Sequence, residues 1–579
     1  MRDLIRPDTF VGLRLPSDAI QVVRVVPNTS ISIGKYGSFY ANHIIGRPYH
    51  LTFEVLDKSD TSPAQSGLRI VSASELYADL RDGEASTPSE SNDLGVAEGN
   101  SGVEYELVGE DGEVVLRTNR AIIDDSSTQT MTMAQIEALK AECTGSGRDL
   151  IQKILGSHIA LDQKTAFALA KYTLRKTKKY LRSFTVLPVD VPLLAHWILT
   201  DKEPIKIMEL REETLALMGS LLNLHCTAIH SEPNGHGSGI GSGRWLLIDE
   251  TSGLLAASTA EKIGVLNQPK ALVPSIVNDE HEQANSDADD TATASHSIAQ
   301  PFKPPRIHSS SSLAYLNTIT VIHANSQPNL SLLKYFEFDH ANPSPSHPLC
   351  RHLKTLSWLQ LLAPEDDLAY TEPDTFPNET IQSWKSGRRG NYYRKRRRWE
   401  RIKSIVDETR AGGFDGLMIA TGMDLATVLH HTVPLLRGGA QVVIYSPTVE
   451  PLVEISDYYS LGRRTAFITD PPEPGSMPTE DFPLDPTLLL AATIHTVKCR
   501  PWQVLPGRTH PLMTGRGSSE GYIFTATRVL PAEGKIEARG NFKRRRVNDG
   551  NGSRGSEIVE QTLEPIGREL GEGDGTNIS

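Results

Sequence analysis

RWLLIDETSGLLAASTAEKIG, at residues 244–264, predicts a strand, a turn and a helix in that order. An apolar run ends at Asp249, and Gly253 marks the turn before an apolar helix. The same succession recurs downstream, with strands expected at 318–325, 414–420 and 441–446 and helices at 347–362, 423–436 and 449–459. Such alternation implies parallel strands joined by crossover helices, and hence a doubly wound α/β sheet.

The pattern extends in both directions from this run. Residues 204–224 have helical periodicity, and apolar strands at 488–499 and 521–530 follow each other without a helix, so we expect an antiparallel pair at one edge of the sheet. Polar residues at 268–312 and a sharp change of charge at 364–400 indicate two insertions. The sequence therefore predicts a Rossmann-like domain over 184–531 and a disordered tail over 532–579.

The first part of the chain has a different character. Residues 1–128 are predicted to form a β-barrel-like domain, because short β-branched and aromatic runs alternate with Gly and Pro. Residues 81–102 are acidic and are expected to be a disordered insertion ahead of the last strands, at 103–108 and 113–118. Residues 129–183 are expected to be a short helical connector, in which Thr132 and Gln135 have capping-box spacing and Ser146 starts a second helix. A strand at 184–192 is expected to join it to the next domain, which makes the chain an α+β multidomain protein.

The charge of the chain is unevenly distributed. The formal net charge is -12, but residues 75–113 hold twelve acids against one arginine, and residues 279–290 hold six acids and no base. The remainder is net positive, so a polyanionic partner is compatible with the acidic total. The four cysteines are scattered without metal or disulfide spacing, and no long apolar run is present. We expect a soluble intracellular protein without a metal site or membrane partner.

KTAFALAKYTLRKTKKYLR, at residues 164–182, is a basic amphipathic helix. It has seven cations and no acid, so no carboxylate lies at helical spacing to pair with them. A solvated helix face is the usual interpretation of such a run, but the missing acids favour an external polyanion. The candidate RNA-binding residues of this helix are Lys164, Lys171, Arg175, Lys176, Lys178, Lys179 and Arg182.

A second basic run lies at residues 385–403, where ten cations face Glu400 alone. Trp384, Tyr392, Tyr393 and Trp399 adjoin or interrupt the run, a composition that suits phosphate contact combined with base stacking. A nuclear-targeting run is an alternative. The candidate RNA-binding residues here are Arg394, Arg396 and Arg397.

Three blocks carry a resemblance to a known family: residues 164–190, residues 347–362 and HPLMTGRGSSEGYIFTA at 510–526. Together they resemble the non-catalytic, RNA-binding subunits of the eukaryotic tRNA (adenine-58-N1)-methyltransferase. The resemblance implies a class I methyltransferase-like C-terminal domain and a catalytic paralogous subunit as partner, in a heterotetramer of two plus two. It also implies a nuclear complex that methylates the T-loop adenosine of tRNA with S-adenosylmethionine.

Residue by residue, the resemblance implies a degenerate cofactor site. The turn Asp249-Glu250-Thr251-Ser252-Gly253 has one glycine where active paralogues have about three. His323 and Asn325 stand where a ribose-binding carboxylate is expected. Ala420-Thr421-Gly422 replaces the paralogues' Asp-Leu-Pro, although Asp424 lies nearby.

We therefore expect a non-catalytic chain that binds no cofactor, with S-adenosylmethionine in the catalytic partner. Two alternatives remain open at this point. One is an active S-adenosylmethionine-dependent RNA methyltransferase with a divergent loop, and the other is a non-enzymatic translation-initiation factor.

Overall fold

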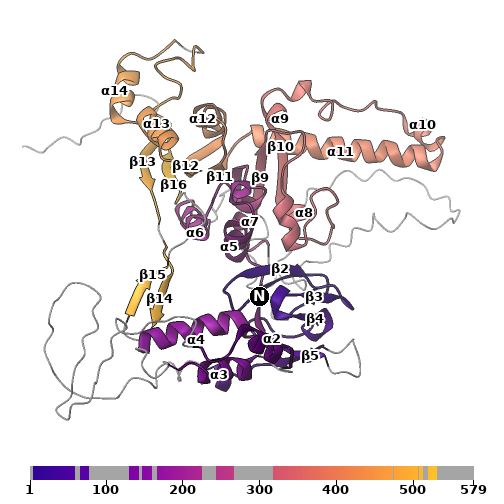
Figure 1. Ribbon diagram of the computed structural model, residues 1–579. Coiled ribbons are helices and arrows are strands. Elements are labelled where there is room, and N and C mark those ends of the chain that lie inside the picture. Colours follow the sequence, from indigo (N-terminus) through magenta and orange to yellow (C-terminus); the bar gives the residue numbers. More distant parts are fainter. Residues whose placement is uncertain are drawn as a thin grey trace, which may run out of the picture. The chain divides into compact units, whose positions relative to one another are not determined.

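The computed structural model (Figure 1) describes residues 4–58, 66–76, 129–142, 147–159, 166–224, 243–266, 317–473, 475–497, 499–505, 508–512 and 520–530. Residues 1–531 form one compact unit. Several expectations lie outside the described residues: the disordered stretches at 81–102, 268–312 and 532–579, the strands at 103–108 and 113–118, and Lys164.

A seven-stranded sheet organises the second half of the chain, with strand order β10-β9-β8-β11-β12-β16-β13. Neighbours from β10 to β12 pair in parallel, whereas β16 is antiparallel to both β12 and β13. The strands are β8 (Arg244–Asp249), β9 (Thr318–His323), β10 (Leu353–Ser357), β11 (Phe414–Ala420), β12 (Leu436–Ser446), β13 (Leu489–His495) and β16 (Tyr522–Arg528). The predicted Rossmann-like sheet and its antiparallel edge pair are confirmed.

Both faces of this sheet are buried, because successive strand residues point to opposite sides. Trp245 and Leu247 of β8 belong to one core, and Leu246 and Ile248 belong to the other. The first core includes α5 (Val191–Asp201), α6 (Glu212–Leu221), α7 (Leu254–Lys262) and η7 (Ser331–Phe336). The second includes α9 (Trp358–Leu362), α12 (Leu425–Thr432) and α13 (Glu450–Tyr458), and the end of α11 (Ser386–Arg410) also packs on this domain.

Two local predictions in this domain are wrong. The helix expected at 347–362 is divided into α8 (Leu349–His352), strand β10 and α9, because the middle residues pair with β9 at the sheet edge. Residues 191–201 form α5, which was not predicted. Asp190 accepts a hydrogen bond from the backbone N–H of Leu193 at 2.8 Å, and Pro192 occupies the first turn of the helix, where proline is tolerated.

The N-terminal part contains a five-stranded antiparallel sheet with order β2-β1-β7-β5-β6. Its strands are β1 (Phe10–Arg14), β2 (Ile20–Arg24), β5 (Thr52–Lys58), β6 (Ser66–Ile70) and β7 (Ser183–Pro188). Phe184 of β7 stacks on Phe39 and Phe53, with ring centroids 4.5 and 5.6 Å away. The domain boundary predicted at 183/184 is therefore wrong, since the central strand of the first sheet follows the helical connector. Among the described pairings β2 and β6 are edges, so closure into a barrel stays a prediction.

The helical connector contains α2 (Met133–Glu142), α3 (Arg148–Gly156) and α4 (Ala166–Tyr180). The capping box is confirmed: the N–H of Gln135 donates to Thr132 Oγ1 at 3.3 Å, and the N–H of Thr132 donates to Gln135 Oε1 at 2.9 Å. Helix α3 follows Gly147, which has a φ of 86°, and Ser146 lies outside the described residues. Tyr180 packs on a small core of Ile136, Leu150 and Ile154, which joins the three helices.

The remaining elements are short. They are β3 (Ser30–Ser32), β4 (Ser38–Tyr40), η1 (Gly34–Tyr36), η2 (Ala41–His43), η5 (Pro204–Ile207), η8 (Pro364–Asp366), α10 (Asn378–Gln382), η9 (Val433–Leu435), α14 (Leu461–Thr469), β14 (Trp502–Leu505) and β15 (Arg508–Pro511). In the part of the chain that the structure describes, every helix is too short or too polar to cross a bilayer.

Candidate RNA-binding surface and methyltransferase-like site

Helix α4 presents most of the first group of candidate residues. Lys171, Arg175, Lys176, Lys178 and Lys179 lie on the helix, and Arg182 follows it directly. Arg175 and Lys179 are exposed, and the other four are half-buried. Lys176 Nζ lies 4.8 Å from the ring centre of Tyr172, and Lys179 Nζ lies 5.1 Å from that of Tyr180. The six cations therefore differ in how accessible they are to a partner.

Lys178 corrects the expectation that these cations lack an acidic partner. Its ammonium group forms an ion pair with Asp18, from the loop between β1 and β2, and its backbone carbonyl accepts a hydrogen bond from the Tyr36 hydroxyl at 2.7 Å. The prediction considered only acids three or four residues away on the same helix. That criterion could not identify a carboxylate 160 residues away in sequence.

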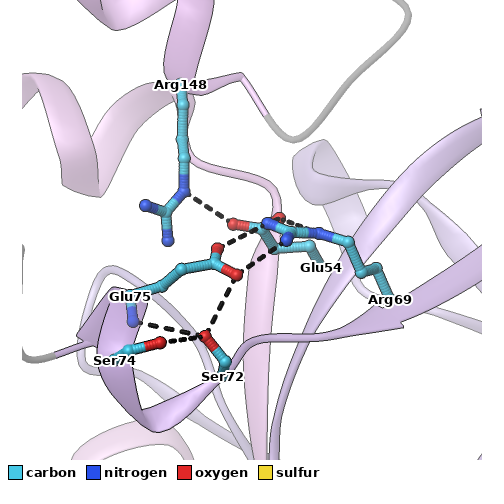
Figure 2. Close-up of polar contacts among 6 residues, drawn as sticks. All are labelled: Glu54, Arg69, Ser72, Ser74, Glu75 and Arg148. Atoms are coloured by element: carbon cyan, nitrogen blue, oxygen red, sulfur yellow. Dashed lines mark hydrogen bonds and ion pairs between the residues drawn. The ribbon is translucent and has the colours of Figure 1, made fainter.

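A buried polar network fixes the start of α3 to the N-terminal sheet (Figure 2). The side chain of Glu54, in β5, is only 1% exposed. It accepts hydrogen bonds from Arg69 Nε at 3.1 Å and from Arg148 Nε at 2.8 Å, and Arg69 also pairs with Glu75 at 2.9 Å. The hydrogen bond from Arg69 holds the pKa of Glu75 below its ordinary value.

This network positions α4 indirectly. Arg148 begins α3, and Gly147 lies so close to the end of α4 that an added Cβ would sit 2.4 Å from the carbonyl oxygen of Tyr180. Glu54 therefore holds the helix pair that carries the cationic surface. Sequence reasoning missed this role, because the only signal is an acid between the apolar residues Phe53 and Val55 of β5.

The second basic run forms most of α11, a continuous helix of 25 residues. Arg394 and Arg397 are exposed, whereas Arg396 is held against the chain by Glu372 at 3.5 Å and Glu400 at 3.4 Å. The insertion predicted at 364–400 thus ends inside a helix that continues to Arg410. Val406 and Thr409, in its last turns, are buried.

Three of the aromatic residues near this run, Trp384, Tyr392 and Trp399, are half-buried and contact other groups of the chain. Tyr392 packs edge-on against Phe376 and Trp384, with ring centroids 6.0 and 5.6 Å away. Trp399 donates a hydrogen bond from Nε1 to the carbonyl of Tyr370 at 2.8 Å. These contacts oppose the expectation that the rings stack on bases.

The methyltransferase-like site lies at the carboxyl edge of the seven-stranded sheet, where Asp249 ends β8. The Asp249 carboxylate is buried and accepts from the N–H of Thr251 at 2.8 Å, the Thr251 hydroxyl at 2.6 Å and the N–H of Ala256 at 2.9 Å. Burial raises its pKa, and these hydrogen bonds act in the opposite direction. Asp249 therefore caps α7 within its own strand-turn-helix unit.

Gly253 lies against the chain rather than in open space. It has a φ of +92°, and an added Cβ would sit 3.0 Å from Cα of Leu330. The carbonyl of Ser252 accepts from the N–H of Leu332 at 3.0 Å, and Ser252 Oγ accepts from Asn329 Nδ2 at 3.2 Å. The segment leading into η7 therefore covers this turn.

The other positions at this edge are also bonded within the chain. Glu250 accepts a hydrogen bond from the N–H of Gly422 at 2.7 Å, and His323 Nδ1 lies 2.6 Å from the carbonyl oxygen of Asn325. Ala420 is fully buried at the end of β11. Asp424 caps α12 by accepting from the N–H of Thr427 at 2.8 Å, so it does not supply the missing acid at Ala420.

In the described ranges, no three His, Cys, Asp or Glu residues lie close enough together to hold a metal ion.

Comparisons with known proteins place the chain in a family. The Gcd10p family model matches residues 4–385. The non-catalytic subunit trm6 of tRNA (adenine(58)-N(1))-methyltransferase from Aspergillus fumigatus is 49% identical, over 94% of this chain and 96% of the relative. The protein of the same name from Schizosaccharomyces pombe is 26% identical, over 94% of this chain and 95% of the relative.

Among solved structures, the tRNA (m1A58) methyltransferase TrmI from Aquifex aeolicus has a TM-score of 0.35 and 8% identity, over 91% of this chain and all of that one. That similarity is too low to support residue-level correspondence. From the family model and the full-length relatives, the chain belongs to the Gcd10p family, whose members here are named as non-catalytic subunits of tRNA (adenine(58)-N(1))-methyltransferase.

Proposed function

We propose that this chain is the tRNA-binding, non-catalytic subunit of the complex that forms N1-methyladenosine at position 58 in the T-loop of tRNA. The names of its close relatives support the complex and the non-catalytic role. One structural observation supports an RNA-binding role without catalysis. Exposed cations are present on α4, while the polar groups at the carboxyl edge of the sheet are hydrogen-bonded within the chain.

The chain is proposed to bind no S-adenosylmethionine itself. A doubly wound site needs an open glycine-rich turn and a free carboxylate for the ribose hydroxyls. Here Leu330 covers Gly253, the Asp249 carboxylate already accepts hydrogen bonds from Thr251 and Ala256, and His323 rather than a carboxylate ends β9. The residues present therefore do not fit the cofactor, and its binding is assigned to the partner.

The partner is proposed to be a catalytic paralogous subunit in a nuclear heterotetramer of two plus two. In the described part of the sheet β13 pairs on one side only, with β16, so its outer edge offers unpaired backbone groups to a second sheet. A single one-to-one dimer in native mass spectrometry of the co-expressed chains would contradict this stoichiometry.

Co-expression with and without the catalytic partner tests the main assignment. We expect adenosine-58 methylation of a tRNA transcript only when both chains are present. Equilibrium dialysis of this chain against labelled S-adenosylmethionine should show no saturable binding. Methylation by this chain alone would instead make it an active enzyme. A normal level of the modification in cells lacking the chain would favour a role outside tRNA methylation.

A further inference from the structure

We propose that Arg394, Arg397, Arg398 and Arg401 on α11, here called the arginine stripe, bind the phosphate backbone of a double-stranded RNA stem. The inference deepens the proposed function and rests on its premise that this chain binds RNA. It adds a second binding element beside α4 and names the form of RNA that this element takes.

The spacing of the arginine stripe places its four guanidinium groups on one side of α11. Positions separated by three, four and seven residues share a helix face, and the stripe spans about 10 Å along the axis at 1.5 Å per residue. All four residues are exposed. A straight helix can therefore present them together to a rigid polyanion.

No described residue neutralises this stripe. Arg394 donates to Asn391 Oδ1 at 3.3 Å, a neutral acceptor, and none of the four forms an ion pair with a described acid. The pairs 394/398 and 397/401 have like charges at helical spacing, which costs each pair a few tenths of a kcal/mol. A purely structural helix gains nothing from that repulsion, whereas a bound polyanion removes it.

The opposite face of α11 is held in place by the segment that precedes the helix. Arg396 pairs with Glu372 at 3.5 Å, Tyr392 packs on Trp384, and Trp399 is hydrogen-bonded to the carbonyl of Tyr370. The Tyr370 hydroxyl in turn donates to Asp407 at 2.8 Å. These contacts order the helix before any ligand arrives, so little conformational entropy is lost on binding.

The same contacts favour a duplex over a single strand. Single-strand binding uses aromatic rings on which bases stack, but Trp384, Tyr392 and Trp399 are half-buried and already engaged by neighbouring groups of the chain. Tyr393 is the exception, at 41% exposed. Duplex RNA is recognised through phosphates and 2′-hydroxyls rather than bases, which matches a surface of guanidinium groups.

The test measures RNA binding by the full chain with all four stripe residues changed to Gln. The probes are a 20-base-pair RNA duplex, one of its strands alone and a tRNA transcript, titrated by fluorescence anisotropy at several salt concentrations. We expect about tenfold weaker duplex binding. The log-log salt slope should fall by about 0.7 to 0.9 for each phosphate that the variant no longer neutralises.

A control with the same loss of charge is Lys202→Gln, Lys262→Gln, Lys334→Gln and Arg351→Gln, all at exposed positions away from α11. It should bind the duplex like the unchanged chain. Circular dichroism must show equal helix content for both variants.

Tyr393→Ala is expected to leave duplex binding unchanged. A loss of single-strand binding in that variant alone would indicate stacking of bases on Tyr393 and would overturn the duplex assignment.

Two further outcomes would also overturn the inference. Unchanged duplex affinity and salt slope in the stripe variant would exclude phosphate contacts. Unchanged RNA binding with impaired nuclear accumulation would assign the stripe to a transport protein. The double variant Arg175→Gln/Lys179→Gln, on α4, separates this inference from the proposed function. If the α4 variant weakens tRNA binding and the stripe variant does not, only the stripe assignment fails. If neither variant weakens tRNA binding, the premise that this chain binds tRNA fails.

Discussion

At the scale of single residues, a buried acid and a half-buried acid have contrasting surroundings. Glu54 is satisfied by two arginines, Arg69 and Arg148, one from the neighbouring strand and one from the helical connector. Glu261, on α7, is half-buried and pairs with no arginine among the described residues, although the backbone N–H of Val191 donates to it. Burial, with a contribution from Asp190, raises its pKa to about 7. The first carboxylate is held by two guanidinium groups, whereas burial disfavours ionisation of the second.

Replacing Glu54 by Gln should destabilise the full chain by about 2 kcal/mol, because the change leaves two arginines without their buried anion. Chemical denaturation monitored by circular dichroism measures the effect. Glu75→Gln is the control, since this side chain is 35% exposed and an exposed ion pair contributes little, so this change should destabilise the chain much less than Glu54→Gln. Equal effects of the two changes would mean that the buried network does not fix α3.

Glu261 predicts a dependence of stability on pH. An acid whose pKa rises from 4.5 to about 7 on folding binds more protons in the native state between those values. The free energy of unfolding should therefore fall as pH rises from about 4.5 to about 7, by up to about 3 kcal/mol from this group. Glu261→Gln should be more stable than the unchanged chain at pH 8 and similar to it at pH 4.5. Parallel pH profiles of the two proteins would contradict the assignment.

At the scale of secondary structure elements, α4 and the turn between β8 and α7 show how function is divided within the chain. Helix α4 keeps Arg175 and Lys179 exposed, while Lys178 is engaged by Asp18. The turn at Gly253 is covered by the backbone of Leu330. Helix α4 is therefore accessible to a polyanion, whereas the turn at Gly253 is covered by another segment of the same chain.

Changing Arg175 and Lys179 to Gln should weaken tRNA binding several-fold and lower the log-log salt slope by up to about 1.4 to 1.8, as expected for two phosphate contacts. Filter binding at several salt concentrations provides the measurement. Lys178→Gln serves as a comparison, because removal of its ion pair with Asp18 should affect stability more than the salt slope. If Lys178 alone changed the slope, the exposed face of α4 would not be the one that contacts RNA.

At the scale of the whole molecule, the order of elements along the chain differs from their grouping in space. Strand β7 lies between β1 and β5 in the N-terminal sheet, yet it follows the helical connector in sequence. The connector is therefore an insertion between strands of one sheet. The C-terminal end of its basic helix is tied to that sheet in two ways. Tyr180 lies against Gly147, next to the Arg148–Glu54 hydrogen bond, and β7 follows the helix directly in the chain.

This topology predicts how fragments behave. A fragment of residues 1–128 lacks the central strand and should not fold, since β1 and β5 would lose their shared partner and Phe184 would leave the stack on Phe39 and Phe53. A fragment of residues 1–190 keeps all five strands and should show dispersed amide signals in NMR spectra. Cooperative unfolding of the shorter fragment would contradict the observed strand order.

Much of the fold was determined by the sequence itself. The apolar strands at 244–249 and 414–420 and the helices beside them have periodicities that only one kind of sheet satisfies, and the Thr132/Gln135 cap depends on neighbours three residues apart. Each of these features depends on contacts within one or two turns of chain, which a sequence pattern records directly.

Tertiary structure alone decided the rest. Residues 353–357 have helical neighbours but become strand β10, because pairing with β9 at the sheet edge outweighs local preference. Lys178 and Asp18, or Glu54 and Arg148, meet across about a hundred residues or more of chain. Leu330 covers Gly253 from a distant segment. Local pattern carries no information on which remote group will satisfy a buried charge or close a turn, since that choice is made by packing of the whole chain.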